Sequence, residues 1–279
     1  MVLRRGLQGK MERSEAAHPT AKEFGHFCKI TKRTMKAIIL AAGKGTRLNG
    51  VELKPKCLFE VGGRTLLQRQ ISALVEAQLD EIVLVLGFEA DRILRHCPPT
   101  TSFVLNSRFG ETSSLYSLWL ARKHLTDGFV VLNCDVLFHS QLLNKLLSSS
   151  FDDALLVDFV NKQHNHLGDE EMKVKVSDGL VVDIRKDMDP ADADGENVGM
   201  VKFSRQGAHR LIEQMDALIS QGCEREWAPL AFREFAARYP LHAISTNNYP
   251  WIEIDFPEDY RRAQEEVFPR IDSMIGSFC

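Results

Sequence analysis

Short apolar runs alternate with helically spaced apolar residues along the chain from residue 35 onward. The runs at 35–40, 81–86 and 101–105 are compact and bounded by polar or turn-forming residues, which is typical of buried strands. Between them, apolar residues recur at helical spacing in 67–75, and 88–95 is expected to return as a second helix. This order of elements predicts a parallel sheet with right-handed crossovers.

The next segments continue this pattern. Residues 106–122 begin as a loop and are expected to continue as a helix that Thr112 or Ser113 caps. The apolar run 128–133 predicts another buried strand, which ends just before Asp135. Open α/β sheets bind ligands beyond the carboxyl ends of their strands, so this strand is expected to bring an acidic side chain to the ligand edge.

From residue 154 onward the pattern changes to shorter strands with polar loops, as in a mixed sheet. These strands are expected at 154–160, 172–176, 180–184, 198–203, 241–244 and 251–254. The accompanying helices are expected at 142–147, from a Ser204 cap through Ile219, at 227–237, and from Pro257 through 266.

Together these elements predict an α/β fold with a Rossmann-like mixed, mainly parallel sheet flanked by helices. Residues 35–268 are expected to form the folded domain, with a first half at 35–150 and a second half at 151–268. Residues 1–34 carry more Lys and Arg than Asp and Glu and lack periodicity, so a basic, disordered extension is expected there. Residues 269–279 are expected to be a C-terminal tail.

The composition limits the class of protein. Of the 279 residues, 44% are hydrophobic and 26% are charged, as in ordinary soluble globular proteins. A formal net charge of -3 gives no reason to expect nucleic acid as a partner. No apolar run approaches the roughly 18 residues that a membrane helix needs. The six cysteines are scattered without a C-x-x-C pair, which favours reduced thiols and a cytoplasmic location.

A glycine-rich turn follows the first predicted strand. Gly43 and Gly45 allow a sharp turn and a close approach of backbone N–H groups to an anion, because glycine reaches φ > 0 and has no Cβ. Thr46 adds a hydroxyl donor. The turn is therefore a candidate phosphate-binding loop.

Basic side chains accompany this turn. Arg47 offers a planar fork of donors for phosphate oxygens, while Lys44 and Lys56 act as mobile point charges, so the set suits a nucleoside triphosphate. Two other glycine motifs do not fit. A Walker A loop would need glycine where Ile38 stands, and the dinucleotide fingerprint would need glycine at Leu48. A glycine-rich turn beside a solvated basic face is the structural alternative.

Two aspartates are candidate metal ligands, because Asp135 and Asp255 each follow a predicted strand. Transfer of a nucleotide to a phosphate brings anions together, and Mg²⁺ with a few hard oxygen ligands can offset that charge. Each residue also has a structural alternative. Asp135 could serve as a turn or cap residue, and Asp255 could cap the helix that begins near Pro257.

Three motifs carry a family resemblance. They are Gly43-x-Gly45-Thr46-Arg47-Leu48 with Pro55-Lys56, Asn106 followed by Thr112-Ser113-Ser114-Leu115-Tyr116-Ser117-Leu118, and Trp251-Ile252-Glu253-Ile254-Asp255 with Glu258-Asp259. The first resembles the signature of nucleotidyltransferases that make sugar nucleotides and CDP-alcohols. The other two resemble the branch of phosphocholine cytidylyltransferases and their relatives that act on small phosphonates.

This resemblance implies roles for individual residues. The nucleotide-binding set would be Ala41, Ala42, Gly43, Lys44, Gly45, Thr46, Arg47, Asn106, Ser113 and Ser114. Catalysis would rest on Lys56, Arg47, Asp135 and Asp255, with the two aspartates holding Mg²⁺. The family usually has glycine at the position of Cys134 and a pair of asparagines at Ser113-Ser114, so this chain departs from the pattern twice.

The acceptor side is expected in the second half of the domain. By this resemblance Lys186 would meet the acceptor phosphate. The rest of the acceptor is expected to meet an aromatic face from Tyr116, Trp227, Tyr249 or Trp251 and a carboxylate from Glu196, Glu226 or Glu253. A quaternary ammonium prefers aromatic faces and a nearby carboxylate, which these side chains could supply. Aromatic residues at such positions are more often part of the core, which is the alternative.

The resemblance implies a Mg²⁺-dependent cytidylyltransferase that transfers CMP from CTP to a phosphocholine-like or aminoethylphosphonate-like acceptor and releases pyrophosphate. In this hypothesis the first half of the domain binds the nucleotide and the second half binds the acceptor. One alternative is a sugar-1-phosphate nucleotidyltransferase that uses UTP, dTTP or GTP. Another is a non-catalytic nucleotide-binding regulatory protein. A homodimer is an open alternative to a monomer.

Overall fold

The first half of the main sheet is parallel. The computed structural model describes residues 35–48, 54–79, 81–99, 101–160 and 167–276. The central strand β1 (Lys36–Ala41) pairs in parallel with β4 (Ile82–Leu86) on one side and with β6 (Phe129–Asn133) on the other. Strand β5 (Ser102–Leu105) then pairs in parallel with β4. The carboxyl ends of these strands therefore lie at one edge.

The second half of the same sheet is mixed. Strand β11 (Gly195–Phe203) runs antiparallel to both β6 and β8 (Ala154–Phe159), and β12 (His242–Ser245) lies parallel to β8. Strands β10 (Leu180–Arg185) and β9 (Lys173–Ser177) complete it with antiparallel pairings. Within the described residues the order is β5-β4-β1-β6-β11-β8-β12-β10-β9.

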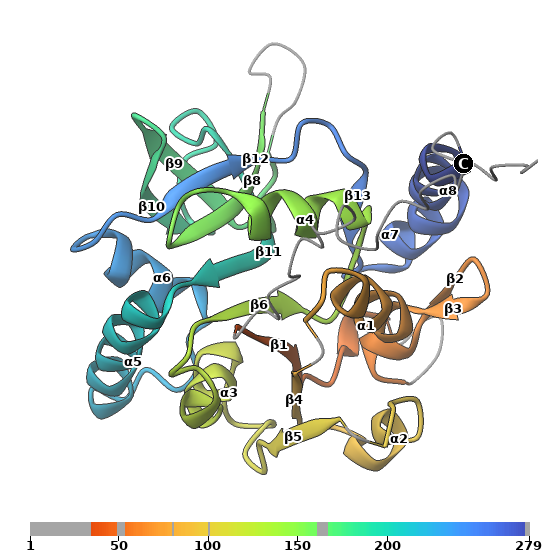
Figure 1. Cartoon of the computed structure of the whole chain (residues 1–279), viewed down its shortest axis with the longest axis horizontal. Helices are drawn as coiled ribbons and strands as arrows, with labels where there is room; N and C mark the ends of the chain where they lie inside the picture. Colours follow the sequence, from red (N-terminus) through yellow and green to blue (C-terminus); the bar gives the residue numbers. More distant parts are fainter. Residues whose placement is uncertain (1–34, 49–53, 80, 100, 161–166, 277–279) are drawn as a thin grey trace, which may run out of the picture. The chain divides into compact units, whose positions relative to one another are not determined.

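Helices cover both faces of this sheet (Figure 1). One face packs against α3 (Ser114–Leu120), α5 (Arg205–Ser220) and α6 (Pro229–Ala236). The opposite face packs against α1 (Leu66–Glu76), α2 (Ala90–Leu94) and α4 (Ser140–Ser148). Short 3-10 helices lie at Thr46–Leu48, Lys56–Leu58 and Arg122–His124.

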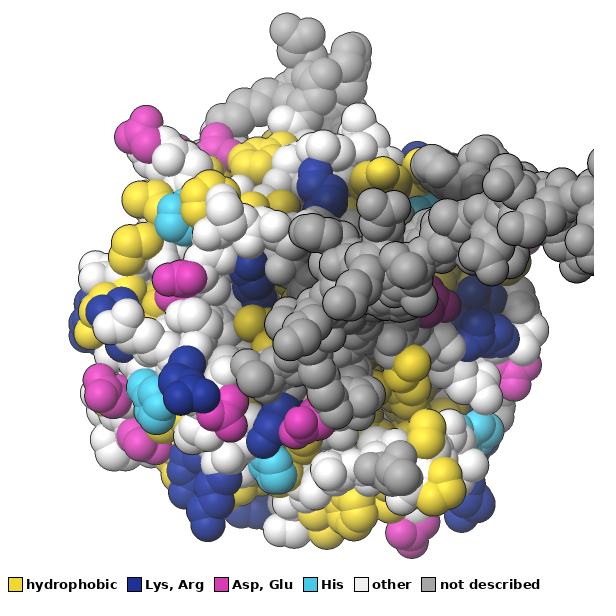
Figure 2. Space-filling model, in the orientation of Figure 1, with side chains coloured by type: hydrophobic (Ala, Val, Ile, Leu, Met, Phe, Trp, Pro, Cys, Tyr) yellow, Lys and Arg dark blue, Asp and Glu magenta, His cyan; other side chains and the backbone are white. Residues whose placement is uncertain are grey.

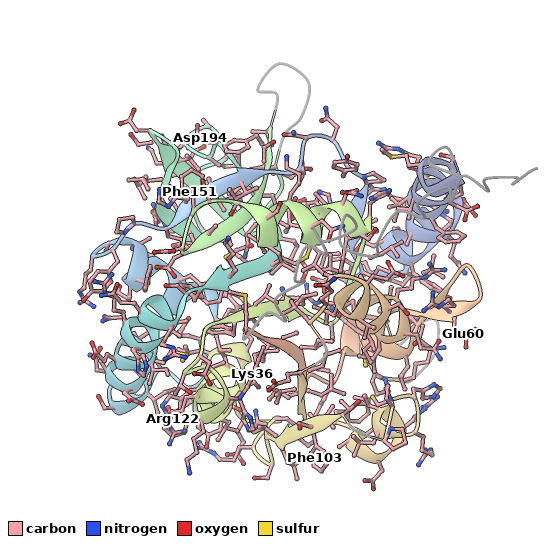
Figure 3. The ribbon with its side chains drawn as sticks, in the orientation of Figure 1. Lys36, Glu60, Phe103, Arg122, Phe151 and Asp194 are labelled. Atoms are coloured by element: carbon pink, nitrogen blue, oxygen red, sulfur yellow. The ribbon has the colours of Figure 1, made fainter. Side chains whose placement is uncertain are left out.

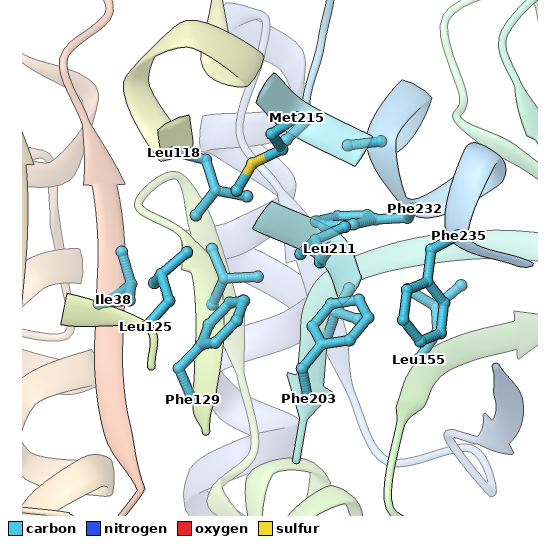
Figure 4. Close-up of a cluster of buried hydrophobic side chains, with 14 of the residues drawn as sticks. Ile38, Leu118, Leu125, Phe129, Leu155, Phe203, Leu211, Met215, Phe232 and Phe235 are labelled. Atoms are coloured by element: carbon cyan, nitrogen blue, oxygen red, sulfur yellow. The ribbon is translucent and has the colours of Figure 1, made fainter. Parts of the chain in front are cut away.

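Successive residues of the central strands enter opposite cores, because side chains alternate along a strand. Ile38 on β1 joins the cluster under α3, α5 and α6, whereas Ile39 joins the cluster under α1 and α4. Phe203 occupies the middle of the first cluster, with its ring centroid 5.4 Å from that of Phe129 and 5.0 Å from that of Phe235 (Figure 4). This two-sided packing fixes the sheet that carries the site.

Two short ladders lie outside the main sheet. Strand β7 (Val136–Phe138) pairs antiparallel with β13 (Trp251–Glu253), and β2 (Glu60–Val61) pairs with β3 (Arg64–Thr65). The chain then forms α7 (Pro257–Arg262), a π-helical segment (Ala263–Val267) and α8 (Phe268–Gly276). The segment 269–279, expected to be a tail, is thus helical through residue 276.

The predicted α/β fold with a mixed sheet and flanking helices is confirmed. Ser204 caps α5 as expected, since its Oγ accepts a hydrogen bond from the Gly207 N–H at 3.1 Å. Two details differ. The run 251–254 was expected to belong to the main strand set but pairs with β7, a strand too short for its pattern to be recognised. Val75 was counted on the apolar face of its helix, yet it is 54% exposed.

The surface carries both signs of charge. Among the described side chains on the face shown in Figure 2, Lys and Arg are interspersed with Asp and Glu. Phe103 on edge strand β5 and Asp194, near the opposite edge strand β9, lie toward opposite ends of the ribbon (Figure 3). None of the described helices is both long and apolar enough to cross a membrane. The expected extension at 1–34 falls outside the described residues.

Candidate active site

The segments that follow β1, β5 and β6 meet at one edge of the sheet. A cleft of about 330 Å³ opens at this edge and reaches into the second half of the sheet. It gathers most of the side chains that the sequence singled out. The predicted site residues that line it are Ala42, Gly43, Gly45, Arg47, Lys56, Asn106, Ser113, Ser114, Asp135, Lys186, Glu253 and Asp255.

Lys56 connects the two halves of this cleft. Its Nζ donates a hydrogen bond to Asp135 Oδ2 at 3.0 Å and another to Asp255 Oδ1. All three side chains are largely buried. Burial alone would lower the pKa of Lys56, but the charges of Asp135 and Asp255 outweigh it and hold that pKa above its usual value. The lysine is therefore a fixed cation at the centre of the site.

The contacts of the two aspartates differ from those of turn or cap residues. The β7–β13 ladder brings them together, and the Ile254 N–H donates to the Asp135 carbonyl oxygen at 3.0 Å. Asp255 does not cap α7. The carboxylate of Asp259 accepts hydrogen bonds from the backbone N–H groups of Asp255 and Phe256 instead. Both aspartate side chains are thus directed at Lys56.

Arg47 supplies a second cation. Its guanidinium lies 3.0 Å from Asp255 Oδ2 and 2.9 Å from Glu170 Oε2, and the side chain is 42% exposed. Gly45 has a φ of +62°, and a Cβ built on it would lie 2.8 Å from Cγ of Lys56. Glycine is required there both for the left-handed backbone and for the close approach of the lysine.

Three carboxylates of the site could hold a metal ion. Asp135, Glu253 and Asp255 each offer one oxygen, and these oxygens lie within 4.8 Å of one another. Burial, reinforced by the charges of Asp135 and Asp255, raises the pKa of Glu253 to about 8. Hard oxygen ligands in this arrangement suit Mg²⁺ or a similar divalent cation, which would relieve their repulsion. Glu253 had been predicted as an acceptor ligand, not as part of this acidic group.

The glycine turn contributes unevenly to the cleft. Ala42, Gly43 and Gly45 line it, whereas Ala41 is a buried residue of β1 and does not. Lys44 is also absent from the lining, and its Nζ lies 5.7 Å from the centroid of the Phe109 ring. The other predicted member, Thr46, begins the short 3-10 helix that carries Arg47.

The predicted cytidine pocket is held by internal hydrogen bonds. Asn106 is 1% exposed, and its Nδ2 donates to Thr112 Oγ1 at 3.1 Å and to Ser117 Oγ at 3.0 Å. Ser114 Oγ accepts from the Ala228 N–H at 2.8 Å, while the Ser113 side chain makes no capping bond to α3. Asn106 and Ser114 therefore position the wall of the pocket, and Ser113 is the better placed of the three to contact a ligand.

The predicted acceptor residues separate into two pockets. Lys186 lines the main cleft, with its Nζ 3.3 Å from Glu170 Oε2 and 4.9 Å from the centroid of the Trp227 ring. Glu196 and Trp251 line an adjoining pocket of about 480 Å³, which shares Glu170, Glu253 and Asp255 with the cleft. We name it the acidic pocket for its lining by Asp158, Asp169, Glu170, Glu171, Glu196, Glu253, Asp255 and Asp259.

Glu226 is exposed and lines neither pocket, contrary to the expectation for an acceptor ligand. The contribution of Glu226 to the fold comes from its backbone: its carbonyl oxygen accepts a hydrogen bond from the Leu115 N–H, in the first turn of α3, at 3.2 Å. Glu170 was missed by sequence reasoning, although its carboxylate contacts both Arg47 and Lys186. It lies in a run of acidic residues, where no pattern distinguishes it from its neighbours.

Cys134 stands where the resembling family usually has glycine. Its pKa is raised well above the usual value by its interaction with the neighbouring Cys57 and by its partial burial. Among the described residues, the group of side chains that could hold a metal ion is Asp135, Glu253 and Asp255, and it does not include Cys134. Cys134 is therefore assigned no part in holding a cation.

Comparisons with known proteins found relatives that match most of the chain. The family model for the MobA-like NTP transferase domain matches residues 37–236. A bifunctional IPC transferase and DIPP synthase from Archaeoglobus fulgidus is 29% identical over 92% of this chain, which spans only 49% of that protein. The chain therefore spans about half the length of such bifunctional relatives.

Two further likenesses cover nearly all of the related protein. The choline-phosphate cytidylyltransferase of Streptococcus pneumoniae is 26% identical over 83% of this chain and 97% of its own length. A solved structure of the CTP:phosphocholine cytidylyltransferase from Streptococcus pneumoniae superposes with a TM-score of 0.68, at 22% identity, over 83% of this chain and 98% of the other. At that identity the structural likeness shows the fold alone.

Proposed function

The chain belongs to the family of MobA-like NTP transferase domains, which are nucleotidyltransferases, and we propose that it transfers CMP from CTP to a small acceptor bearing a phosphate or phosphonate. The acceptor in this proposal is phosphocholine-like or aminoethylphosphonate-like. The observation that carries the proposal is the position of Lys56 between Asp135 and Asp255, in the same cleft as the glycine turn.

In the proposed reaction an oxygen of the acceptor's phosphate or phosphonate attacks the α-phosphorus of CTP. A new oxygen–phosphorus bond forms, the bond to the bridging oxygen breaks, and pyrophosphate leaves with that electron pair. The acceptor is already an ionised nucleophile at neutral pH, so no general base is needed. The protein contributes alignment and charge neutralisation, which together account for most of the rate acceleration in many sites of this kind.

The cationic residues have distinct roles in this proposal. Lys56 stabilises the charge that grows on the α-phosphate, and Arg47 meets the phosphates that leave. Lys186, on the second half of the sheet, binds the acceptor phosphate. Asp135 and Asp255 hold Mg²⁺, which when bound would neutralise phosphate charge and polarise the attacked phosphorus.

The choice of CTP is supported by the names of the relatives. The matches include the choline-phosphate cytidylyltransferase and a CTP:phosphoglutamine cytidylyltransferase from Campylobacter jejuni, which is 24% identical over 81% of this chain. Ser113 and Ser114 border the expected base pocket, and small hydroxyl side chains there leave room for hydrogen bonding to a pyrimidine.

The proposal is tested by following pyrophosphate release. The protein is incubated with Mg²⁺ and each of CTP, UTP, dTTP and GTP, against a panel of small phosphates, small phosphonates and sugar 1-phosphates. Release that needs CTP and a small phosphate or phosphonate is expected. Release with a sugar 1-phosphate and another nucleotide would replace the proposal by the sugar-nucleotide alternative, and binding of nucleotide without any release would favour a regulatory protein.

A further inference from the structure

The acidic pocket is a second cavity that opens beside the main cleft. It shares Glu170, Glu253 and Asp255 with the cleft, and its only basic lining residue within the described chain is Arg262, 4.0 Å from Asp259. A molecule whose phosphate lies near Lys186 can therefore extend its other end into strongly negative surroundings. Such a concentration of carboxylates needs compensation, because like charges in partly buried surroundings repel one another strongly.

Several of these carboxylates lack partners among the described residues. Glu171 Oε2 is buried and has no hydrogen-bond partner there. The side chain of Glu196 likewise forms no hydrogen bond or ion pair with any described residue. The buried ammonium of Lys173 faces Glu196, but among the described residues its hydrogen bonds go to the carbonyl oxygens of Lys186 and Glu171, at 2.7 and 3.5 Å. Buried acceptors left without donors are costly, so the pocket is suited to a ligand that brings N–H groups.

The aromatic lining argues against a quaternary ammonium. Trp251 and Phe256 are the aromatic residues among the described lining. The Arg47 guanidinium lies 5.2 Å from the centroid of the Phe256 ring, which leaves Trp251, whose indole N–H donates to Asp158 Oδ2 at 3.0 Å, as the remaining aromatic side chain of this lining. Recognition of a trimethylammonium group relies on several open aromatic faces, and that group donates no hydrogen bond. A primary ammonium offers three donors.

We propose that the acidic pocket binds a primary ammonium group of the acceptor, with Glu196 and Glu171 as its principal partners, and that the enzyme thereby selects aminoalkyl phosphates or phosphonates over trimethylated and neutral ones. The proposal rests on the proposed function and deepens it. The phosphate end of such a zwitterion lies near Lys186 and the attacked nucleotide, and the ammonium end lies in the acidic pocket. Each end meets the opposite charge.

Equilibrium binding tests this selectivity without requiring turnover. The protein is saturated with Mg²⁺ and α,β-methylene-CTP and titrated calorimetrically with 2-aminoethylphosphonate, its N-trimethylated analogue and 2-hydroxyethylphosphonate. The primary amine is expected to bind at least about tenfold more tightly than either analogue. Glu196→Gln is expected to weaken the amine at least about tenfold and to leave the hydroxyl analogue within about twofold. Glu171→Gln serves as a second variant, and Glu213→Gln, on an exposed position of α5, serves as the matched control.

Three results would overturn the proposal: equal or tighter binding of the trimethylated analogue, an equal loss for all three ligands in Glu196→Gln while its thermal unfolding matches wild type, or no binding of any of them. Its failure is distinguishable from failure of the proposed function. If the protein binds the amine selectively but releases no pyrophosphate, the proposed transfer reaction is wrong and the proposed ammonium site stands. If pyrophosphate is released equally with acceptors that have and lack the amine, the ammonium site is wrong and the transfer reaction stands.

Discussion

Lys56 Nζ lies 3.0 Å from Asp135 Oδ2, although 79 positions separate the two residues in the sequence. The same ammonium group donates to Asp255, which is 199 positions away. Three distant parts of the chain therefore meet at one cation. Because each partner arrives on a different element, the fold as a whole is what assembles this charge arrangement.

Removal of that cation should abolish most of the activity. Lys56→Met is expected to lower kcat about 100- to 1,000-fold, because the charge that grows at the α-phosphate loses its fixed partner. Circular dichroism should show an intact fold. Lys123→Met, at an exposed position, is the control and should retain wild-type kcat. Wild-type kcat in Lys56→Met would show that the lysine has no part in the transfer step.

Gly45 tests whether the glycine turn positions Lys56. Gly45→Ala is expected to lower kcat about 10- to 100-fold, because the new methyl would displace the lysine side chain. Gly63→Ala is the matched control, since Gly63 also has a positive φ but has nothing within 4 Å of an added Cβ. Both variants should lose about 1–2 kcal/mol of unfolding free energy from the left-handed backbone. Equal kcat values for the two would contradict the positioning role.

Glu170 should hinder binding of anions. Its carboxylate contacts Arg47 and Lys186, the two cations that bind the phosphates of the nucleotide and of the acceptor in the proposed reaction, so it competes with those phosphates. Glu170→Gln is expected to lower both KM values by up to about fivefold with kcat unchanged, a small effect because Glu170 is 59% exposed. Asp127→Asn, which breaks the exposed ion pair with Arg205, is the control. A rise in both KM values would instead identify Glu170 as a substrate ligand.

Local patterns predicted much of the fold. The alternation of short apolar runs and helical spacing predicted the parallel strands around β1, because those strands are buried on both faces and their runs are continuous. Strand β7 escaped detection, since the three residues of 136–138 are too few for a period to be seen. Its partner β13 was recognised as a strand, but periodicity carries no information about which strand pairs with which.

The central residues of the site were predicted from motifs and from the ends of strands. Lys56 and Asp255 lie in motifs of recognisable spacing, Asp135 was predicted because it follows a strand, and the structure brings the three together. Glu226 was selected for its residue type alone, and residue type does not tell which way an exposed loop side chain points. Glu170 and Glu171 belong to the site because of where the fold places them: Glu170 pairs with Lys186, which is distant in sequence, and Glu171 has a buried carboxylate oxygen. No local sequence pattern predicts such tertiary placement.

Acceptor binding should depend on pH through Glu196. Burial, and then the charges of Glu171 and Asp158, raise the pKa of Glu196 to about 8. Binding of an ammonium group needs the ionised carboxylate, so below that pKa a proton must be released. The affinity for 2-aminoethylphosphonate should therefore rise by up to about tenfold per pH unit between about pH 6 and about pH 8, and then level off. The groups that face Glu196 are Asp158, Glu171, Lys173, Glu253 and Asp259.

Calorimetric titrations between about pH 6 and about pH 8 give the slope of affinity against pH for 2-aminoethylphosphonate. The same titrations with 2-hydroxyethylphosphonate, which lacks the amine, measure the part of that slope that comes from ionisation of the phosphonate, and so correct for it. After that correction, Glu196→Gln should show no remaining slope over the same range. If the affinity of Glu196→Gln still rises with pH after that correction, a group other than Glu196 releases the proton.

The central claim is that Asp135 and Asp255 hold a divalent cation for transfer of CMP. The most direct measurement is the rate of CMP transfer from CTP to 2-aminoethylphosphonate as a function of Mg²⁺ concentration, in wild type, Asp135→Asn and Asp255→Asn, with CTP binding measured in parallel. The account predicts no transfer in excess chelator, saturable activation by Mg²⁺, and a loss of about 100-fold or more in each variant with CTP binding retained. Full transfer in chelator, or wild-type rates in either variant, would contradict it.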